Sequence, residues 1–98
     1  MEHIIEELQK VKEELLLRSY SQKKHKSYLY IIQKFLVQTN KSSLCLEEKD
    51  VRSYLLELIG KGYGRESVRL TRAALRFYFK NILRKLLSLE NVPLPKRA

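Results

Sequence analysis

The chain has 98 residues, a formal net charge of +9, and a hydrophobic content of 44% that includes six Tyr and three Phe. Its length suits one domain, and this hydrophobic content predicts a folded core rather than a disordered chain. The single cysteine excludes an internal disulfide and a cysteine-rich zinc site, and no apolar run reaches the roughly 20 residues of a membrane span. With three Gly, two Pro and no alternating strand-like runs, the sequence predicts an all-α domain.

The positive charge is concentrated in two blocks of the chain. Residues 1–18 and 42–60 each carry a net charge of −2, whereas residues 19–41 carry +5 and residues 61–98 carry +8. A net excess that is confined to separate blocks indicates a surface for a polyanion, for which nucleic acid is the natural candidate.

The first predicted helix covers residues 2–18. Its apolar residues recur at helical spacing: Ile4, Ile5, Leu8, Val11 and Leu15. The polar face is acidic, whereas helices that lie on membrane surfaces usually carry basic ones. We therefore expect this helix to pack against the core or to contact a protein partner, and we expect no membrane association.

A second helix is predicted over residues 22–38, with Ser21 as its N-cap. Its first turns contain Lys23, Lys24 and Lys26, and cations at a helix N-terminus oppose the helix dipole. A bound phosphate would contact both these lysines and the free backbone N–H groups. The alternative interpretation is a lysine patch that only keeps the protein soluble.

A third helix is predicted over residues 48–60. It follows a polar connector at residues 39–43 and an apolar segment at residues 44–46, in which we expect Cys45 to be a small buried hydrophobe. Acidic residues gather in its first turn, where they interact favourably with the helix dipole. This helix is expected to pack, not to contact a ligand.

Residues 60–64 form a glycine-punctuated turn, in which Gly60 or Gly62 is expected to adopt the left-handed conformation that ends a helix. The segment lacks the GxxxxGK[ST] pattern of a nucleotide-binding loop, and no strand precedes it. We therefore expect no nucleotide site and no cofactor.

The fourth predicted helix, residues 65–85, has a row of cations along one side. Their spacing of four, three, four and four places five residues on one stripe: Arg65, Arg69, Arg72, Arg76 and Lys80. The apolar side consists of Val68, Leu75, Phe77, Tyr78, Phe79, Ile82 and Leu83, with Phe77 off its centre. No Asp or Glu occurs between residues 67 and 89, so the stripe lacks the pairs that stabilise a surface helix. A bound anionic backbone would reverse that repulsion.

No metal or catalytic site is predicted. His25 has no carboxylate or second ligand in its segment, and His3 lies near the chain terminus. Residues 91–98 contain two prolines and end in basic residues, which is typical of a linker. We therefore expect a helical domain at residues 1–90 and the start of a linker at residues 91–98.

Three segments together resemble the N-terminal, SAM-like core-binding domain of tyrosine recombinases (the Xer and phage-integrase superfamily), in an archaeal-like form. Residues 21–28 resemble the family's S-x-x-T-x-x-x-Y helix, with Lys24 in place of Thr. Residues 50–55 resemble its D-V-x-x-Y-L helix. Residues 62–68, followed by residues 74–79, resemble its G-x-S-x-x-[ST]-[IV]…A-L-[RK]-x-F-[FY] helix, with Gly64 in place of Ser.

This resemblance implies a four- to five-helix orthogonal bundle that forms one half of a clamp around duplex DNA, with the second and fourth helices facing the DNA. The implied DNA-binding residues are Lys23, Lys24, Lys26, Arg65, Ser67, Arg69, Arg72, Arg76 and Lys80. The family's chemistry lies in a separate C-terminal domain, so this chain is expected to be non-catalytic and its tyrosines structural. The expected partners are DNA and other recombinase protomers, in a cytoplasmic, nucleoid-associated setting, with the isolated domain monomeric.

Two alternatives remain open from the sequence. One is a helical protein–protein interaction module that binds an acidic partner through the basic fourth helix. The other is a stand-alone DNA-binding regulator that consists of this domain only.

Overall fold

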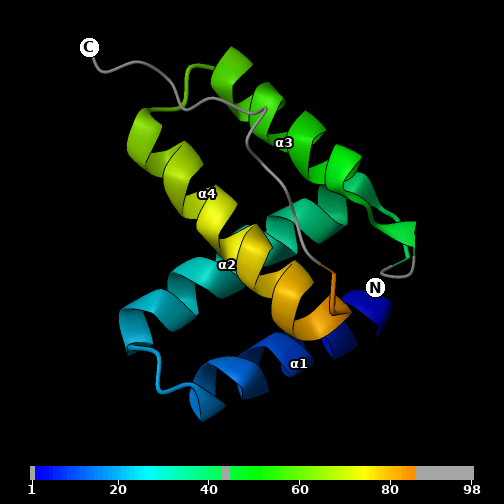
Figure 1. Cartoon of the computed structure of the whole chain (residues 1–98), viewed down its shortest axis with the longest axis vertical. Coiled ribbons are helices and arrows are strands. Elements are labelled where there is room, and N and C mark those ends of the chain that lie inside the picture. Colours follow the sequence, from blue (N-terminus) through cyan, green and yellow to red (C-terminus); the bar gives the residue numbers. More distant parts are fainter. Residues whose placement is uncertain (1, 43–44, 86–98) are drawn as a thin grey trace.

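A computed structural model of the chain describes residues 2–42 and 45–85. This part contains four α-helices and a π-helical turn, and no strand: α1 (Glu2–Leu17), α2 (Gln22–Thr39), α3 (Glu48–Gly60), α4 (Arg65–Tyr78) and η2 (Phe79–Leu83). α4 packs against both α2 and α3, and η2 packs against α1 (Figure 1). The all-α prediction is confirmed, and no helix in the described residues is long and apolar enough to cross a membrane.

The helix ends follow the predicted local signals. The Ser21 hydroxyl accepts a hydrogen bond from the Lys24 N–H at 3.3 Å and caps α2, as expected. Gly62 is the residue after α3 that takes the left-handed conformation, with φ of +88°. Ser19 and Asn40 adopt the same conformation after α1 and α2. These turns are tight, so the helices fold back on one another and enclose a common core.

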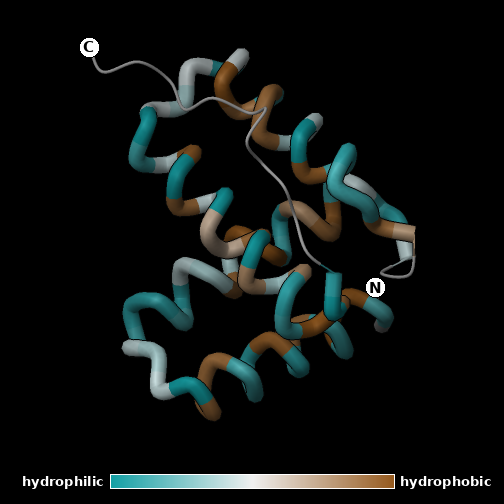
Figure 2. Tube along the Cα trace, viewed as in Figure 1, coloured by the Kyte–Doolittle hydropathy of each residue, from teal (hydrophilic) through white to brown (hydrophobic). Residues whose placement is uncertain are grey.

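All four helices contribute to that core. Its fully buried members include Val11, Leu15, Ile32, Phe35, Leu36, Val51, Leu55, Val68, Leu75, Tyr78 and Phe79. The hydrophobic stretches of the tube in Figure 2 lie largely where the helices face one another. Phe35 of α2 contacts the ring of Tyr54 at 5.3 Å and that of Phe79 at 6.3 Å, so aromatic packing joins α2, α3 and η2.

A buried polar contact joins the two ends of the domain. The Tyr78 hydroxyl donates a hydrogen bond of 2.6 Å to Glu7 Oε1, and Lys10 Nζ donates one of 3.0 Å to Glu7 Oε2. Glu7 is only 3% exposed. Burial raises its pKa, but the hydrogen bonds from Tyr78 and Lys10 outweigh this effect, and the net pKa is lowered. The contact therefore fixes α1 onto α4 with an ionised carboxylate.

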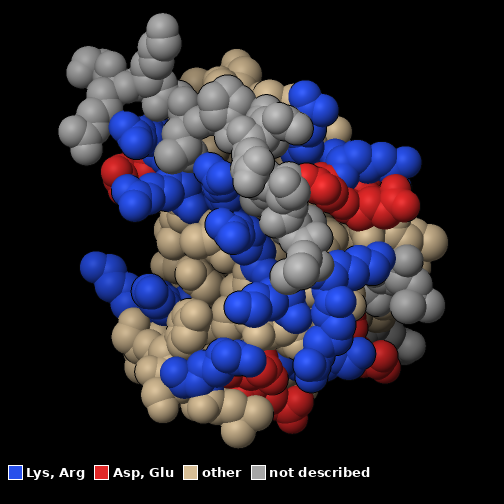
Figure 3. All heavy atoms as spheres, in the orientation of Figure 1, with Lys and Arg blue, Asp and Glu red and all other residues tan. Residues whose placement is uncertain are grey.

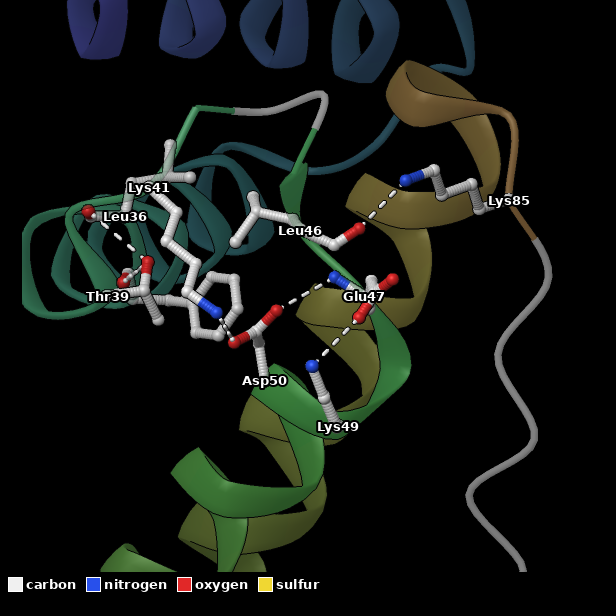
Figure 4. Close-up of polar contacts among 9 residues, drawn as sticks. Leu36, Thr39, Lys41, Leu46, Glu47, Lys49, Asp50 and Lys85 are labelled. Atoms are coloured by element: carbon white, nitrogen blue, oxygen red, sulfur yellow. Dashed lines mark hydrogen bonds and ion pairs between the residues drawn. The ribbon is translucent and has the colours of Figure 1, made fainter.

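The connection between α2 and α3 is also held by polar contacts (Figure 4). Lys41 Nζ lies 2.7 Å from Asp50 Oδ1, and Asp50 Oδ2 accepts the Glu47 N–H at 2.9 Å, which satisfies a free donor at the start of α3. Lys49 forms an ion pair of 3.3 Å with Glu47. The predicted acidic first turn of α3 is thus part of its cap.

The predicted fourth helix does not remain α-helical to residue 85. It widens into the π turn η2 after Tyr78 and ends at Arg84, which has a φ of +60°. Leu83 follows Arg65 by a whole number of α-helical turns. An unbroken α-helix would therefore place Leu83 on the same, solvent-facing side as Arg65. The wider turn instead leaves Leu83 half-buried against the core. Lys85 Nζ then donates a hydrogen bond of 2.8 Å to the Leu46 carbonyl (Figure 4).

Phe77, expected on the apolar side but off its centre, is buried, because the rings of Tyr20 and Tyr28 cover it at 5.3 and 5.7 Å. One prediction about burial was wrong. Cys45 is exposed, because in the turn before α3 the neighbouring Leu46 takes the buried position. Leu44, the domain boundary at residue 90 and the linker at residues 91–98 lie outside the described residues.

Candidate nucleic-acid interface

The cations of α4 form the stripe that their spacing predicts. Arg69, Arg76 and Lys80 are exposed, whereas Arg65 and Arg72 are half-buried at the edges of the helix. Figure 3 shows Lys and Arg side chains following the diagonal course of α4 across this face of the molecule. Because the opposite side of α4 is fixed in the core by Val68, Leu75 and Tyr78, the stripe is held on a rigid element.

The three exposed cations of this stripe form no ion pair in the described part of the chain. In the described residues, the ion pairs involve cations from other parts of the chain: Lys10, Arg18, Lys41, Lys49 and Lys61. Within the same part of the chain, Arg69, Arg76 and Lys80 form no ion pair with a carboxylate. An anion from outside the domain would relieve the repulsion between them.

The lysines at the start of α2 form a second basic patch. Lys23, Lys24 and Lys26 are all exposed there, and Lys24 Nζ lies 5.3 Å from the centre of the Tyr20 ring. The Lys24 N–H already binds the Ser21 hydroxyl, so a phosphate at this site would interact mainly with the lysine side chains.

Lys34 is a further exposed cation of α2, more than two helical turns beyond Lys26, that was not predicted as a contact from the sequence. Lys23, Ser27, Tyr30 and Lys34 follow one another at steps of four, three and four, so they share one side of α2. The cations of α4 have the same spacing. This spacing could have identified Lys34 from the sequence alone. Its Nζ lies 5.4 Å from the centre of the Tyr30 ring.

A groove of about 420 Å³ runs between the second half of α4 and the corner that joins α1 to α2. Arg76 and Lys80 line one wall, and Arg18 and Tyr20 line the other. Arg18 is partly neutralised by Glu14, which lies 3.1 Å from its Nε. The groove therefore extends the basic stripe toward the start of α2.

A smaller cleft of about 220 Å³ lies at the other end of α4, between α2, α3 and α4. It is lined by Ser27, Tyr30, Ile31, Lys34, Tyr54, Leu58, Tyr63, Ser67, Leu70 and Thr71, and we call it the tyrosine cleft. Figure 3 shows a hollow on its left side, between the basic start of α4 and the basic start of α2. Ser67, predicted as a DNA contact, thus lines this cleft and not the arginine stripe.

Comparison with known protein families assigns the domain. The family described as phage integrase, N-terminal SAM-like domain, matches residues 8–89. The chain belongs to this family. No curated protein and no solved structure matches the chain. The match confirms the resemblance and the SAM-like fold, and it supports a role related to recombination; the archaeal-like form stays a prediction.

The matched residues correspond to the N-terminal domain of the integrase family, not to its catalytic domain. The tyrosines on the apolar faces of this integrase domain are part of its core: Tyr28, Tyr54 and Tyr78. Burial raises the pKa of each, and for Tyr78 the hydrogen bond to Glu7 raises it further. Raised pKa values keep these hydroxyls protonated, the opposite of what nucleophilic attack requires.

The described residues of the integrase domain contain no group of three or more His, Cys, Asp or Glu side chains that could hold a metal ion. His25 faces the interior of the bundle and is 8% exposed. Its position fits a packing role.

Proposed function

We propose that this integrase domain binds duplex DNA as the core-binding half of a tyrosine recombinase. The observation that carries the proposal is the row of exposed cations, Arg69, Arg76 and Lys80, that form no ion pair with a carboxylate in the described residues of a domain of this family. The proposed contacts are those predicted from the sequence, with Lys34 added: Lys23, Lys24, Lys26, Lys34, Arg65, Ser67, Arg69, Arg72, Arg76 and Lys80.

The dimensions of the stripe suit a nucleic-acid backbone. With a rise of 1.5 Å per residue, the cations from Arg65 to Lys80 extend over about 20 Å, a length along which duplex DNA presents several phosphates. Phosphate contacts position a protein without reading the sequence. Arginines at the middle of the stripe, such as Arg69 or Arg72, are long enough to reach base edges in the major groove.

In this proposal the domain holds DNA and performs no chemistry. The reacting groups belong to a separate catalytic domain, joined through the linker that we place at residues 91–98. The domain acts beside other recombinase protomers on the DNA, and alone it is a monomer. Its setting is the cytoplasm, at the nucleoid.

A salt titration tests the proposal directly. If about six cations pair with phosphates, a plot of log K against log salt concentration for a duplex should have a slope of roughly −5. The affinity should also rise with duplex length until the surface is filled. A slope near zero contradicts the proposal. Competition by a short acidic peptide, without any dependence on duplex length, would favour a protein-binding module instead.

A further inference from the structure

The tyrosine cleft has the chemistry of a site for one flat ring. Tyr30 and Tyr63 line a recess and are still 61% and 42% exposed, so their side chains are accessible to a ligand. The cleft volume of about 220 Å³ is smaller than the roughly 300–1,000 Å³ of typical sites for drug-sized ligands. A single aromatic ring is the group that suits this space.

The polar groups of the cleft indicate which ring. Lys34 stands beside Tyr30, and the electrostatic influence of Tyr30, followed by that of Tyr63 and Tyr54, raises the pKa of Lys34. The charged ammonium group lies 5.4 Å from the centre of the Tyr30 ring. An ammonium beside open aromatic faces is the arrangement that binds nucleotides, since the rings stack on the base and the cation meets the adjacent phosphate.

The position of the cleft connects it to the proposed DNA surface. One wall belongs to the side of α2 that carries Lys23 and Lys34, and the other wall is formed by Ser67, Leu70 and Thr71, on a side of α4 that does not carry the arginine stripe. A DNA strand that follows this basic side of α2 reaches the mouth of the cleft. Base pairs within an intact duplex are stacked on one another, so only an unpaired base can leave the strand and enter.

We propose that the tyrosine cleft binds one unpaired DNA base, stacked against Tyr30 and Tyr63, while Lys34 contacts the phosphate next to it. The site rests on the proposed DNA binding and makes it selective: DNA with an extrahelical base binds more tightly than perfect duplex. The ammonium of Lys34 among the lining tyrosines favours this occupant over a peptide, because a nucleotide supplies both the ring and the negative charge.

The test compares three duplexes of equal length in fluorescence anisotropy titrations with the full chain. One is fully paired, one carries a single extra unpaired thymidine, and one carries an extra abasic nucleotide at the same position. The abasic bulge distorts the backbone in the same way but offers no ring, which separates stacking from deformability. We expect the thymidine bulge to bind roughly tenfold more tightly than the abasic bulge.

Variants of the exposed rings locate the effect. Tyr30→Ala and Tyr63→Ala should each reduce the preference for thymidine over the abasic bulge toward one, whereas Tyr30→Phe, which keeps the ring, should retain it. Both tyrosines are exposed, so these variants are expected to fold. Val37→Ala is the matched control, since Val37 is an exposed side chain of the same helix that does not line the cleft.

Failure of this inference and failure of the proposed function give different results. Equal binding of all three duplexes overturns the tyrosine cleft as a base site and leaves duplex binding intact. Binding of single-stranded oligothymidylate that depends on Tyr30, without any duplex binding, supports the cleft and overturns the proposed function. Absence of all binding overturns both. If a proline-containing peptide shifts the Tyr30 and Tyr63 ring resonances and the bulged duplex does not, the occupant is a protein and the proposal is wrong.

Discussion

The two helices on either side of the glycine turn, α3 and α4, differ in how their charged residues are paired. α3 begins with an acidic first turn, its lysine and acid neighbours are paired (Lys49 with Glu47, and Lys61 with Glu57), and Asp50 caps its N-terminus. α4 begins at Gly64, which makes no side-chain cap bond, and carries a row of like charges. Both helices are anchored in the same core.

The charges of α3 are arranged by the helix dipole and by pairs of opposite sign. α4 also follows the dipole at its ends, with Glu66 in its first turn and Arg76 in its last, but Arg69, Arg76 and Lys80 form no ion pair with a carboxylate in the described residues. The proposed function accounts for these cations by an anionic ligand, and three experiments test it, from the largest expected effect to the smallest.

The largest effect is expected on DNA affinity. Replacing Arg69, Arg72 and Arg76 together with Ala should weaken duplex binding by about 100-fold or more at moderate salt, because three phosphate contacts are lost. The slope of log K against log salt should become shallower by about three units. Anisotropy titrations at several salt concentrations measure both quantities.

The matched control removes three cations from α3 and its C-cap: Lys49→Ala, Arg52→Ala and Lys61→Ala. This variant has the same net charge as the α4 variant, and we expect it to bind DNA with little change in slope. If both variants lose affinity equally, binding follows net charge alone and the contrast between α3 and α4 has no functional meaning.

The structural features that depend on neighbouring residues, such as helix ends and turns, were predicted well from the sequence. Ser21 marked the start of α2, Gly62 marked the turn after α3, and the spacing of the arginines defined the stripe, since each signal acts within one or two helical turns. The family resemblance, drawn from three segments in order, is confirmed by the match over residues 8–89.

What the sequence did not predict depends on contacts between distant segments. Phe77 is buried because the corner between α1 and α2 covers it, and Tyr78 meets Glu7 across 71 positions of the chain. The π turn η2 leaves Ile82 and Leu83 half-buried against the core, and no local pattern in the sequence predicts this turn. The tyrosine cleft likewise draws on three helices and a turn, so its rings become one site only in the folded domain.

The next effect concerns the buried side of α4. Tyr78→Phe should lower the free energy of unfolding by about 1–3 kcal/mol at neutral pH, because the buried Glu7 carboxylate loses a hydrogen-bond donor. The lowered pKa of Glu7 means that its contribution is fully present above its ordinary pKa of 4.5 and is lost as the pH falls through the native value. Urea denaturation at neutral and acidic pH should therefore show the variant's deficit shrinking in acid.

Tyr28→Phe is the control for this measurement. Tyr28 is also a buried tyrosine, but in the described residues its hydroxyl forms no hydrogen bond, so its removal should have a small effect that does not change in acid. A deficit for Tyr78→Phe that is equal at both pH values would show that the ring environment, and not the ionised Glu7, accounts for the loss.

The smallest effect is the most direct measure of the charge contrast. Arg76→Glu places an acid between Arg72 and Lys80, one turn away on either side, so it exchanges two repulsions for two attractions. We expect the free energy of unfolding to rise by a few tenths of a kcal/mol at low salt, and the gain to disappear at high salt, while DNA affinity falls. Arg52→Glu on α3, next to Glu48, should give no such gain. A gain in stability together with weaker DNA binding would show that Arg76 is retained for the ligand and not for the fold. If Arg76→Glu leaves the free energy of unfolding unchanged at low salt, the stripe imposes no cost on the helix and no ligand is needed to account for it.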